Sequence, residues 1–504
     1  MKDFSRSLLT LLPQASRALA ALPSDRQVNV SGLALDSRQV EPGDLFLARD
    51  GLHHRGADFI AQAVARGAVA VMAQRGSVDA AEKAVLEVPL IEVDDLDATT
   101  GQLASRFYGD PSRHLKVIGI TGTNGKTSCS HYLAQALEAM GHRCALIGTL
   151  GNGIHGALQE SSHTTPNPIE LQSLLADFVR QGAEYVVMEV SSHALDQQRV
   201  AGVRFAAAAL TNLTRDHLDY HGDMETYGQA KARLFTDYAP PLQALNLDDA
   251  FGRRLYADRC GDRAQVLGFS LTDPAADLWV SDLEPTRRGW RFVLHAPAGQ
   301  QPVTTALLGR FNVSNLLLTA SLLQLLGFSL EQTATALSAL QPVSGRMECL
   351  PSAANLPQVV IDYAHTPDAL EQALQALRLH QPDTGQLWCV FGCGGDRDRG
   401  KRPEMGRVAA RGADQLVLTS DNPRREEPGR IMTDILQGIP QGTALHQEEN
   451  RAEAIRWAIT RAAADDLILI AGKGHENYQE VGSVRTPFSD HEQAQHVLKQ
   501  RVDV

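Results

Sequence analysis

Short apolar runs alternate with longer segments of helical pattern from Leu115 onward. This alternation predicts βα units and a parallel sheet. The first 110 residues differ, because short strands and turns flank one alanine-rich helix there. The predicted strands span residues 32–35, 45–48 and 69–72, then 117–121, 144–149, 185–190 and 205–211, and finally 358–362, 387–392, 415–420 and 466–471. The pattern therefore indicates an α/β protein.

Two turn-rich segments, 109–113 and 341–345, separate these parts and are typical of linkers. At roughly 150 residues per domain, a chain of 504 residues is expected to form about three. We predict a small mixed α/β N-terminal domain at 1–112, a central parallel-sheet domain at 113–343 and a Rossmann-like C-terminal domain at 344–504.

The segment Gly122-Thr-Asn-Gly-Lys-Thr-Ser128 follows the predicted strand 117–121 and precedes a helical segment. This is the layout of a phosphate-binding loop, in which backbone N–H groups and the helix dipole face an anion. Lys126 then reaches the β- and γ-phosphates, and the Thr127 hydroxyl binds Mg²⁺. The general pattern has a glycine where Ile120 stands, so a glycine turn with an exposed lysine is the alternative. The segment predicts a central domain of the P-loop ATPase type.

Polar residues follow other apolar strands of the central domain. Glu189 ends one of them, where a carboxylate is unfavourable unless it faces a ligand or metal. Beside a phosphate loop it is a candidate Mg²⁺ ligand, direct or through water, and the alternative is an acid that caps the next turn. His217 lies in a strand-end loop rich in acids and imidazoles, 215–221. Ligands bind at the carboxyl ends of strands in open parallel sheets, so these groups are expected to share one crevice.

The third part shows the same arrangement. Its predicted strands end in four polar segments, 362–366, 392–397, 421–424 and 472–476. Because these ends converge at one edge of a parallel sheet, the C-terminal domain is expected to bind a ligand of its own.

Composition narrows the class of protein. The net charge is −12 and no long Lys/Arg run occurs, which argues against a nucleic-acid partner. No run of 18 apolar residues predicts a membrane span, and the N-terminal apolar segment is too short for a signal peptide. The six cysteines form no CxxC pair and are expected to be reduced thiols. We therefore expect a soluble cytoplasmic protein without a membrane partner.

Several motifs occur in the order found in one family. They are Leu35-Asp-Ser-Arg38, Pro42-Gly-Asp44, Gly122-Thr-Asn-Gly-Lys-Thr127, Glu189-Val-Ser-Ser-His193, Thr211-Asn-Leu213, Asp216-His-Leu-Asp-Tyr-His-Gly222, Ser344-Gly-Arg-Met-Glu348 and Asp362-Tyr-Ala-His-Thr-Pro367. The chain thereby resembles the Mur ligases, the ATP-dependent amide-bond ligases of bacterial peptidoglycan precursor synthesis, over all three predicted domains. The resemblance implies an acyl-phosphate mechanism that forms ADP and phosphate, with Mg²⁺ as cofactor and a monomeric enzyme.

The resemblance also implies roles for individual residues. The implied ATP-binding residues are Gly122, Thr123, Asn124, Gly125, Lys126, Thr127, Ser128, Asn315, Arg346 and Asp362. Those implied to bind UDP-N-acetylmuramoyl-L-alanyl-D-glutamate are Leu35, Ser37, His163, Thr164, Thr165, Ser191, Gln197 and Arg199, and Leu52-His-His54 aligns with a uridine-side loop. Arg346, at a linker, would reach ATP only when the third domain closes.

The resemblance implies catalytic roles for Lys126, Glu189, His217 and Lys231. It implies metal binding for Thr127, Glu189, His217 and Lys231. The family carries the lysine at the position of Lys231 as a carbamate, which converts a cation into an anion able to bridge to Mg²⁺. Apart from this resemblance, Lys231 would be interpreted as an ordinary solvated helix lysine.

The added amine is indicated by the Asp421-Asn-Pro-Arg424 segment, because relatives that add lysine lack the arginine. A guanidinium binds the second carboxylate of meso-2,6-diaminopimelate in a bidentate fork. With lysine as substrate, Arg424 would be desolvated without a partner, at a cost of ~2–5 kcal/mol. The predicted contacts are Arg397, Asp421, Asn422, Pro423, Arg424, Gly472 and Glu476, with the acids suited to ammonium groups. The alternative is an Asn-Pro β-turn with Arg424 in solvent.

Three other functions compete with this interpretation. Folylpolyglutamate synthetase shares the chemistry and the central loop, but the domain before the loop and Arg424 disfavour it. A regulatory P-loop ATPase or nucleotide-dependent binding protein would hydrolyse ATP without an acceptor. An AMP-forming ligase would release pyrophosphate.

Overall fold

The structure is a computed structural model that describes residues 5–12, 28–51, 54–161, 163–259, 264–351, 353 and 355–502. Two compact units divide the chain. The first comprises residues 1–269 and 321–326, and the second comprises residues 270–320 and 327–504.

The first unit begins with a four-stranded parallel sheet in the order β3-β4-β5-β6. Its elements are β1 (Arg6–Ser7), α1 (Leu8–Leu11), β2 (Asn29–Val30), β3 (Gly32–Ala34), η3 (Ser37–Gln39), β4 (Asp44–Ala48), η4 (Gly56–Phe59), α3 (Ile60–Ala65), β5 (Ala70–Gln74), α4 (Ala80–Ala84), β6 (Leu90–Val93), α5 (Leu96–Phe107) and η5 (Pro111–Arg113). Leu45 and Leu47 of β4 share one core with α5, whereas Phe46 packs with α3 on the opposite face. The three strands predicted here are confirmed as β3, β4 and β5.

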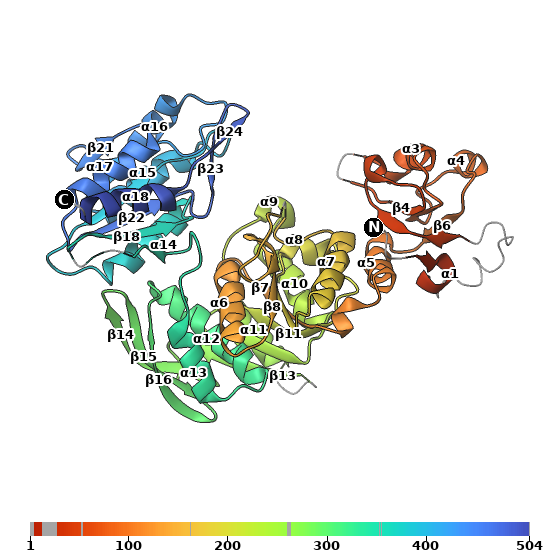
Figure 1. The fold of residues 1–504 in the computed structure, drawn as a ribbon, viewed down its shortest axis with the longest axis horizontal. Helices are drawn as coiled ribbons and strands as arrows, with labels where there is room; N and C mark the ends of the chain where they lie inside the picture. Colours follow the sequence, from red (N-terminus) through yellow and green to blue (C-terminus); the bar gives the residue numbers. More distant parts are fainter. Residues whose placement is uncertain are drawn as a thin grey trace. The chain divides into compact units, whose positions relative to one another are not determined.

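The central part of the first unit is a sheet in the order β13-β12-β11-β7-β10-β8-β9. Its elements are β7 (Lys116–Thr121), α6 (Lys126–Ala139), β8 (Cys144–Gly148), β9 (Gly151–Ile154), α7 (Pro168–Arg180), β10 (Tyr185–Glu189), α8 (Ser192–Asp196), β11 (Phe205–Leu210), α9 (Leu218–His221), α10 (Met224–Thr236), β12 (Leu242–Asn246), α11 (Ala250–Arg259) and β13 (Gln265–Ser270). All neighbouring strands are parallel except β8 and β9. Helices α6 and α7 lie on opposite sides of β7 and β8 (Figure 1). The four strands predicted here are confirmed as β7, β8, β10 and β11.

The second unit begins with an antiparallel meander. Its strands are β14 (Leu278–Thr286), β15 (Gly289–Ala296) and β16 (Gly299–Thr305). Two helices follow, α12 (Arg310–Leu325), whose residues from 321 onward belong to the first unit, and α13 (Leu330–Ala339). The buried His380 ring ties the meander to the rest of the unit, because its Nδ1 donates to the Thr286 carbonyl oxygen (2.8 Å) and its Nε2 accepts from the Gly309 N–H (3.0 Å). This pattern requires a neutral ring with the proton on Nδ1.

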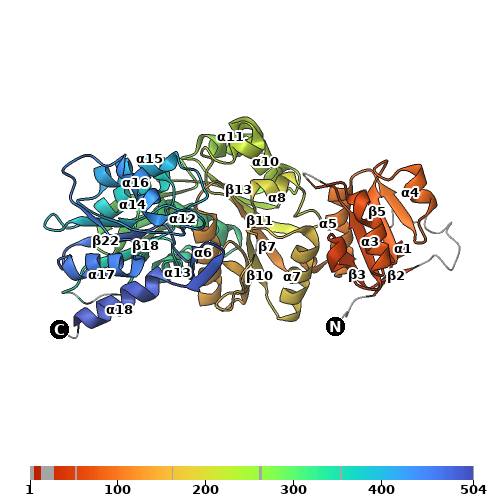
Figure 2. The same cartoon turned by 90° about the horizontal axis from the view of Figure 1, so that it is seen from above.

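The C-terminal part of the second unit is a six-stranded sheet in the order β17-β18-β22-β19-β20-β21. Its elements are β17 (Glu348–Cys349), β18 (Gln358–Asp362), α14 (Pro367–Arg378), β19 (Leu387–Phe391), α15 (Lys401–Gly412), β20 (Gln415–Leu418), α16 (Pro428–Leu436), β21 (Leu445–Gln447), α17 (Arg451–Arg461), β22 (Leu467–Ala471), β23 (Tyr478–Val481), β24 (Val484–Pro487) and α18 (Asp490–Val502). Helices α14, α15 and α16 cover one face, and α17 and α18 cover the other (Figure 2). This is the predicted Rossmann-like arrangement, and its four predicted strands are β18, β19, β20 and β22.

A fully buried ion pair joins the first residues of α17 and α18. The Arg451 guanidinium donates to both carboxylate oxygens of Asp490 at 2.7 Å, and both side chains are 0% exposed. It also donates to the carbonyl oxygens of Ser420 (3.2 Å) and Ala471 (2.9 Å), which precede two of the candidate loops. Arg451 therefore holds the ends of two strands in register beneath the sheet edge.

Replacement of Asp490 with asparagine is expected to lower the free energy of unfolding by about 3–5 kcal/mol, because Arg451 would keep a buried charge without a counter-ion. Chemical denaturation at equilibrium measures this change. Glu371→Gln is the matched control, since the Glu371–Arg411 pair is exposed and its loss is expected to cost less than about 1 kcal/mol. Equal effects of the two changes would contradict the prediction.

Among the helices of the described residues, none combines the length and apolar character that crossing a membrane requires.

Candidate functional site

The loop between β7 and α6 has the backbone of a phosphate-binding loop. Gly122 (φ +144°) and Gly125 (φ +87°) adopt conformations that favour glycine, and a Cβ at Gly122 would collide with the Thr211 hydroxyl. The Lys126 ammonium donates to the carbonyl oxygens of Gly122 and Thr123, both at 2.8 Å. A lysine and the N-terminus of α6 therefore face the same loop, as anion binding requires.

The departure from the general loop pattern has a structural explanation. Ile120 lies inside β7, fully buried and in register with Glu189 and Ala209 of the neighbouring strands. The position belongs to the sheet, so no glycine is needed there. The segment that follows β11 also holds the phosphate-binding loop. Asn212 Oδ1 accepts from the Asn124 N–H, and Thr211 Oγ1 donates to the Asn124 carbonyl oxygen.

Two predicted magnesium ligands lie together at the start of α6. Thr127 Oγ1 donates to Glu189 Oε2 at 3.0 Å, and Glu189 is 1% exposed. Thr149 holds the same carboxylate through its N–H (2.8 Å to Oε1) and its hydroxyl (3.1 Å to Oε2). These are hard oxygen donors that suit Mg²⁺, an ion that commonly combines one or two carboxylates with phosphates and water. Within the described residues, no group of three or more His, Cys, Asp or Glu forms a complete metal cage.

Lys231 is a buried lysine, which contradicts its interpretation as a solvated helix residue. It is 1% exposed on the inner face of α10, and its ammonium donates to the Gly122 carbonyl oxygen at 2.9 Å and lies 4.5 Å from the centre of the Tyr227 ring. Burial, and then the charge of Lys126, hold the pKa of Lys231 well below its ordinary value. A larger share of this amine is therefore unprotonated at neutral pH than in an exposed lysine.

His217 belongs to a cluster of rings beside Lys231. Its backbone is left-handed (φ +53°), and its ring lies 4.9 Å from His193 and 6.1 Å from Tyr227, measured between ring centres. His193 also lies 5.4 Å from His221, and burial, followed by the charges of His217 and His221, lowers the pKa of His193. The sequence indicated His217 alone, although His193 and His221 stand in the motifs that carried the resemblance.

The predicted contacts for the UDP-linked peptide form a hydrogen-bonded chain. Arg199 donates to Gln197 Oε1 (2.7 and 2.9 Å) and to the Thr165 carbonyl oxygen (3.1 Å). The Ser191 N–H donates to Thr165 Oγ1 at 3.1 Å, and Thr164 Oγ1 contacts Thr149 Oγ1 at 3.1 Å. The chain therefore leads from Arg199 to the residues that hold Glu189, while His163 lies exposed next to it.

The structure describes only some of the substrate contacts that were predicted in the N-terminal part of the chain. Ser37 is buried and donates to Gln62 Oε1 at 2.6 Å, and Leu35 packs against the α5 core. Residues 52 and 53 of the predicted uridine-side loop lie outside the described residues. Sequence reasoning missed Arg49, which pairs with Asp97 at 2.5 Å and whose charge, after burial, lowers the pKa of Arg199.

Three predicted nucleotide contacts lie in the second unit. Asp362 accepts from the backbone N–H groups of Met347 (2.7 Å) and Ala364 (2.9 Å). Burial raises the pKa of the Asp362 carboxyl, although the charge of Arg346 acts to lower it. The Arg346 guanidinium lies over the Tyr363 ring, 4.6 Å from its centre. Asn315 is buried in α12 and donates to Asn312 Oδ1 at 3.1 Å.

The predicted amino-acid contacts at the ends of β20 and β22 converge on a residue that the sequence did not indicate, Lys473. Its ammonium donates to Asn422 Oδ1 (2.9 Å) and Glu476 Oε2 (3.1 Å) and lies 3.7 Å from Asp421 Oδ1. Asn422 Nδ2 also donates to Glu476 Oε2 at 2.8 Å. Gly472 (φ +116°) lets the backbone approach this group, because a Cβ there would crowd the Asp421 carboxylate.

Arg424 lies beside the same group, in a left-handed conformation (φ +51°) after Pro423. It donates to the Gly395 carbonyl oxygen (2.9 Å), and its Nε lies 3.4 Å from Glu480 Oε2. The expectation that Arg424 has no partner without a second substrate carboxylate is therefore wrong, and so is the interpretation of Arg424 as free in solvent. Arg397 is exposed, and both arginines approach Gly394.

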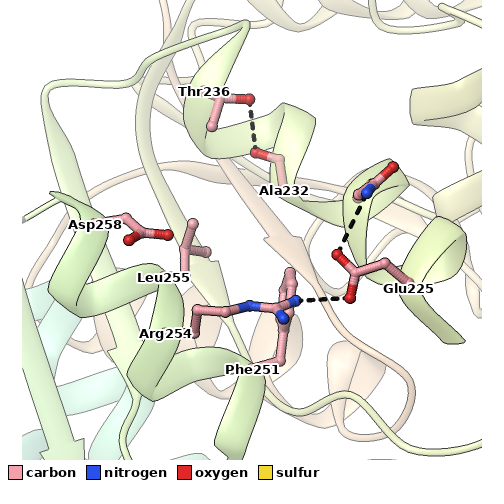
Figure 3. Close-up of a pocket in the computed structure, with 8 residues that line it drawn as sticks. Glu225, Ala232, Thr236, Phe251, Arg254, Leu255 and Asp258 are labelled. Atoms are coloured by element: carbon pink, nitrogen blue, oxygen red, sulfur yellow. Dashed lines mark hydrogen bonds and ion pairs between the residues drawn. The ribbon is translucent and has the colours of Figure 1, made fainter.

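A separate cavity of about 360 Å³ lies between α10 and α11 and contains none of the predicted site residues. Figure 3 shows Arg254 next to Phe251 and directed at Glu225, to which it is paired at 3.3 Å. The cavity opens on the outer side of α10, the helix that carries Lys231.

Known protein families match most of the chain. Three family descriptions match in order: Mur ligase family, catalytic domain, at residues 29–108; Mur ligase middle domain at 120–323; and Mur ligase, glutamate ligase domain, at 345–474. The chain belongs to the Mur ligase family.

Individual relatives cover nearly the whole chain. Proteins named UDP-N-acetylmuramoyl-L-alanyl-D-glutamate–2,6-diaminopimelate ligase from Chromobacterium violaceum and Pseudomonas aeruginosa are each 48% identical, over 98% of this chain and 98% of theirs. A solved structure with the same name has a TM-score of 0.73 at 37% identity and covers 96% of this chain and 99% of its own. Mycobacterium tuberculosis folylpolyglutamate synthase shares the fold alone, with a TM-score of 0.58 at 20% identity over 74% of this chain and 92% of its own.

Proposed function

We propose that this chain is an ATP-dependent ligase that joins meso-2,6-diaminopimelate to UDP-N-acetylmuramoyl-L-alanyl-D-glutamate in peptidoglycan precursor synthesis. The observation that carries the proposal is the near-complete match to relatives with this name at 48% identity. The Lys126, Thr127 and Glu189 arrangement and the polar strand ends of the second unit support it independently. Consumption of ATP is consistent with a cytoplasmic enzyme.

In the proposed reaction, the substrate's terminal carboxylate attacks the γ-phosphorus, and the bond to the β-phosphate oxygen breaks. ADP leaves, and an acyl phosphate remains. The unprotonated amine then attacks the acyl carbon, and phosphate departs with the electrons of the C–O bond while the amine loses a proton. Such chemistry depends mainly on positioning and on neutralising charge.

The residues of the first unit suit these demands. Lys126 and the loop N–H groups would hold the ATP phosphates, and Thr127 and Glu189 would hold Mg²⁺, with Thr149 fixing the carboxylate. The bound metal would neutralise phosphate charge. Asn315, Arg346 and Asp362 remain our candidates for the nucleoside and phosphate contacts.

We also propose that Lys231 is carbamylated. An unprotonated amine adds to CO₂ to form a carbamate and releases one proton, and burial favours that unprotonated form. The change would replace a buried cation near Lys126 with an anion. The carbamate and His217 would then supply ligands to a second metal ion.

The purified chain, supplied with UDP-muramoyl dipeptide, ATP, Mg²⁺ and diaminopimelate, is expected to form one ADP and one phosphate per amide bond. The product mass should equal the sum of the two joined substrates minus one water. Release of ADP without the amino acid would instead support an ATPase, and pyrophosphate would support an AMP-forming ligase. Turnover with a folate and glutamate would support the synthase alternative.

A further inference from the structure

Lys473 is the only lysine among the described residues that is 0% exposed. It follows β22, yet two of its partners, Asp421 and Asn422, follow β20. The end of β19 lies between these strands in the sheet. The lysine therefore reaches across the edge where the predicted amino-acid contacts converge.

The crossing is possible because the chain after β19 is rich in glycine. A Cβ at Gly392 would collide with the Thr419 carbonyl oxygen, and one at Gly395 with that of Pro423. The two loops consequently pack closely backbone to backbone. The carboxylates of Asp421 and Glu476, the Asn422 amide and the Lys473 ammonium therefore form a single cluster.

The hydrogen bonds of Asn422 fix the geometry of that cluster. Its Oδ1 accepts from Lys473 Nζ and from the Glu480 N–H (3.0 Å), while its Nδ2 donates to Glu476. Glu480 in turn is the ion-pair partner of Arg424. Through Asn422, Lys473 is thus connected both to Glu476 and to the Glu480–Arg424 ion pair.

The lysine changes the charge that the site presents. Asp421 and Glu476 together carry two negative charges, and one ammonium at 3.7 and 3.1 Å leaves a net charge of about −1. Diaminopimelate has two amines, but the amine that attacks the acyl phosphate must be unprotonated. One ammonium then remains to be bound, which matches the charge left by Lys473.

We propose that Lys473 is a positioning residue that also sets amino-acid selectivity, by cancelling one of the two carboxylate charges of Asp421 and Glu476. This inference rests on the proposed function. Diaminopimelate carries one more carboxylate than lysine does. A site more negative by one charge therefore disfavours diaminopimelate relative to lysine.

The test compares kcat/KM for diaminopimelate and for lysine in Lys473→Met. We expect KM for diaminopimelate to rise by about 10-fold and the diaminopimelate-to-lysine ratio to fall by about 10-fold, as one unscreened charge within the same site implies. KM for the UDP-linked substrate should stay within about 2-fold, because its predicted contacts lie in the first unit. Calorimetric binding of diaminopimelate gives a readout that does not require turnover.

Two further variants separate charge from shape. Lys473→Arg keeps the charge and is expected to keep the selectivity ratio even if its activity falls. The double variant Lys473→Met with Asp421→Asn restores the net charge of about −1 and is expected to recover much of the ratio lost in Lys473→Met, a coupling that contacting residues show. Arg378→Met, at an exposed pair with Asp414, controls for removal of a cation from this domain.

An active wild-type enzyme with an unchanged ratio in Lys473→Met would overturn the inference and leave the proposed function intact. A ratio in Lys473→Arg as low as in Lys473→Met would also overturn it, because shape and not charge would then decide. If Lys473→Met does not fold, the arginine and double variants are compared with the wild type, and a selectivity ratio about 10-fold below the wild-type ratio in Lys473→Arg would overturn the inference. A wild-type chain that does not use diaminopimelate would instead refute the proposed function.

Discussion

Replacement of Lys231 with alanine is expected to lower kcat by about 10²–10³-fold, the effect usual for loss of one group that stabilises developing charge. Lys231 is buried in α10 and contacts the carbonyl oxygen of Gly122, the first residue of the phosphate loop. Alanine removes both this contact and the proposed carbamate. Steady-state kinetics measure the effect, and KM for diaminopimelate should change little because its predicted contacts lie in the second unit.

Carbon dioxide separates the carbamate from a merely structural lysine. Wild-type enzyme stripped of CO₂ should lose activity and regain it when bicarbonate is added, whereas Lys231→Ala should respond to neither treatment. Lys116→Ala is a suitable control, because Lys116 is exposed and its ammonium contacts the Tyr185 hydroxyl (3.0 Å), away from the predicted site residues. Full activity in Lys231→Ala, or activity independent of CO₂ in the wild type, would refute the proposed modification.

The strands and their polar ends were predictable because local pattern determines them. Apolar runs bounded by glycine or charged residues are short enough to be strands, and those predicted at 117–121, 185–190 and 205–211 are neighbours in the sheet. Parallel order then brings their carboxyl ends to one edge, which explains why Thr127 and Glu189 meet. Even the exception, Ile120, follows from the strand extending through that position.

The residues that were missed are held by partners far away in the sequence. Lys473 contacts Asn422, and Thr149 contacts Glu189 across 40 residues, yet neither contact follows from periodicity or from a short motif. The burial of Lys231 was likewise not predictable from its neighbours, since a helix lysine is ordinarily solvated. Side-chain partners of this kind depend on the packing of several elements, which a single sequence does not determine.

Arg424→Ala is expected to raise KM for diaminopimelate and to lower its kcat/KM relative to lysine by about 10–100-fold, the size of one lost charge-assisted pair of about 1.5–3 kcal/mol. This is less than the penalty expected for an unpaired buried arginine. Glu480 and the Gly395 carbonyl oxygen already satisfy part of the guanidinium, so lysine as substrate does not leave it without partners. Kinetics with both amines measure the ratio, and Arg485→Ala, which removes a more exposed neighbour of Glu480, is the control.

Arg424→Lys distinguishes charge from geometry at this position. The guanidinium contacts Glu480 through Nε and Gly395 through Nη1, and a planar fork can do this while another N–H remains directed to a ligand. A lysine ammonium is a single point that cannot span the same partners. We therefore expect Arg424→Lys to lose most of the preference for diaminopimelate although the charge is kept. If the lysine variant retained the full preference, the positive charge alone would account for selectivity, and the arginine geometry would be irrelevant to it.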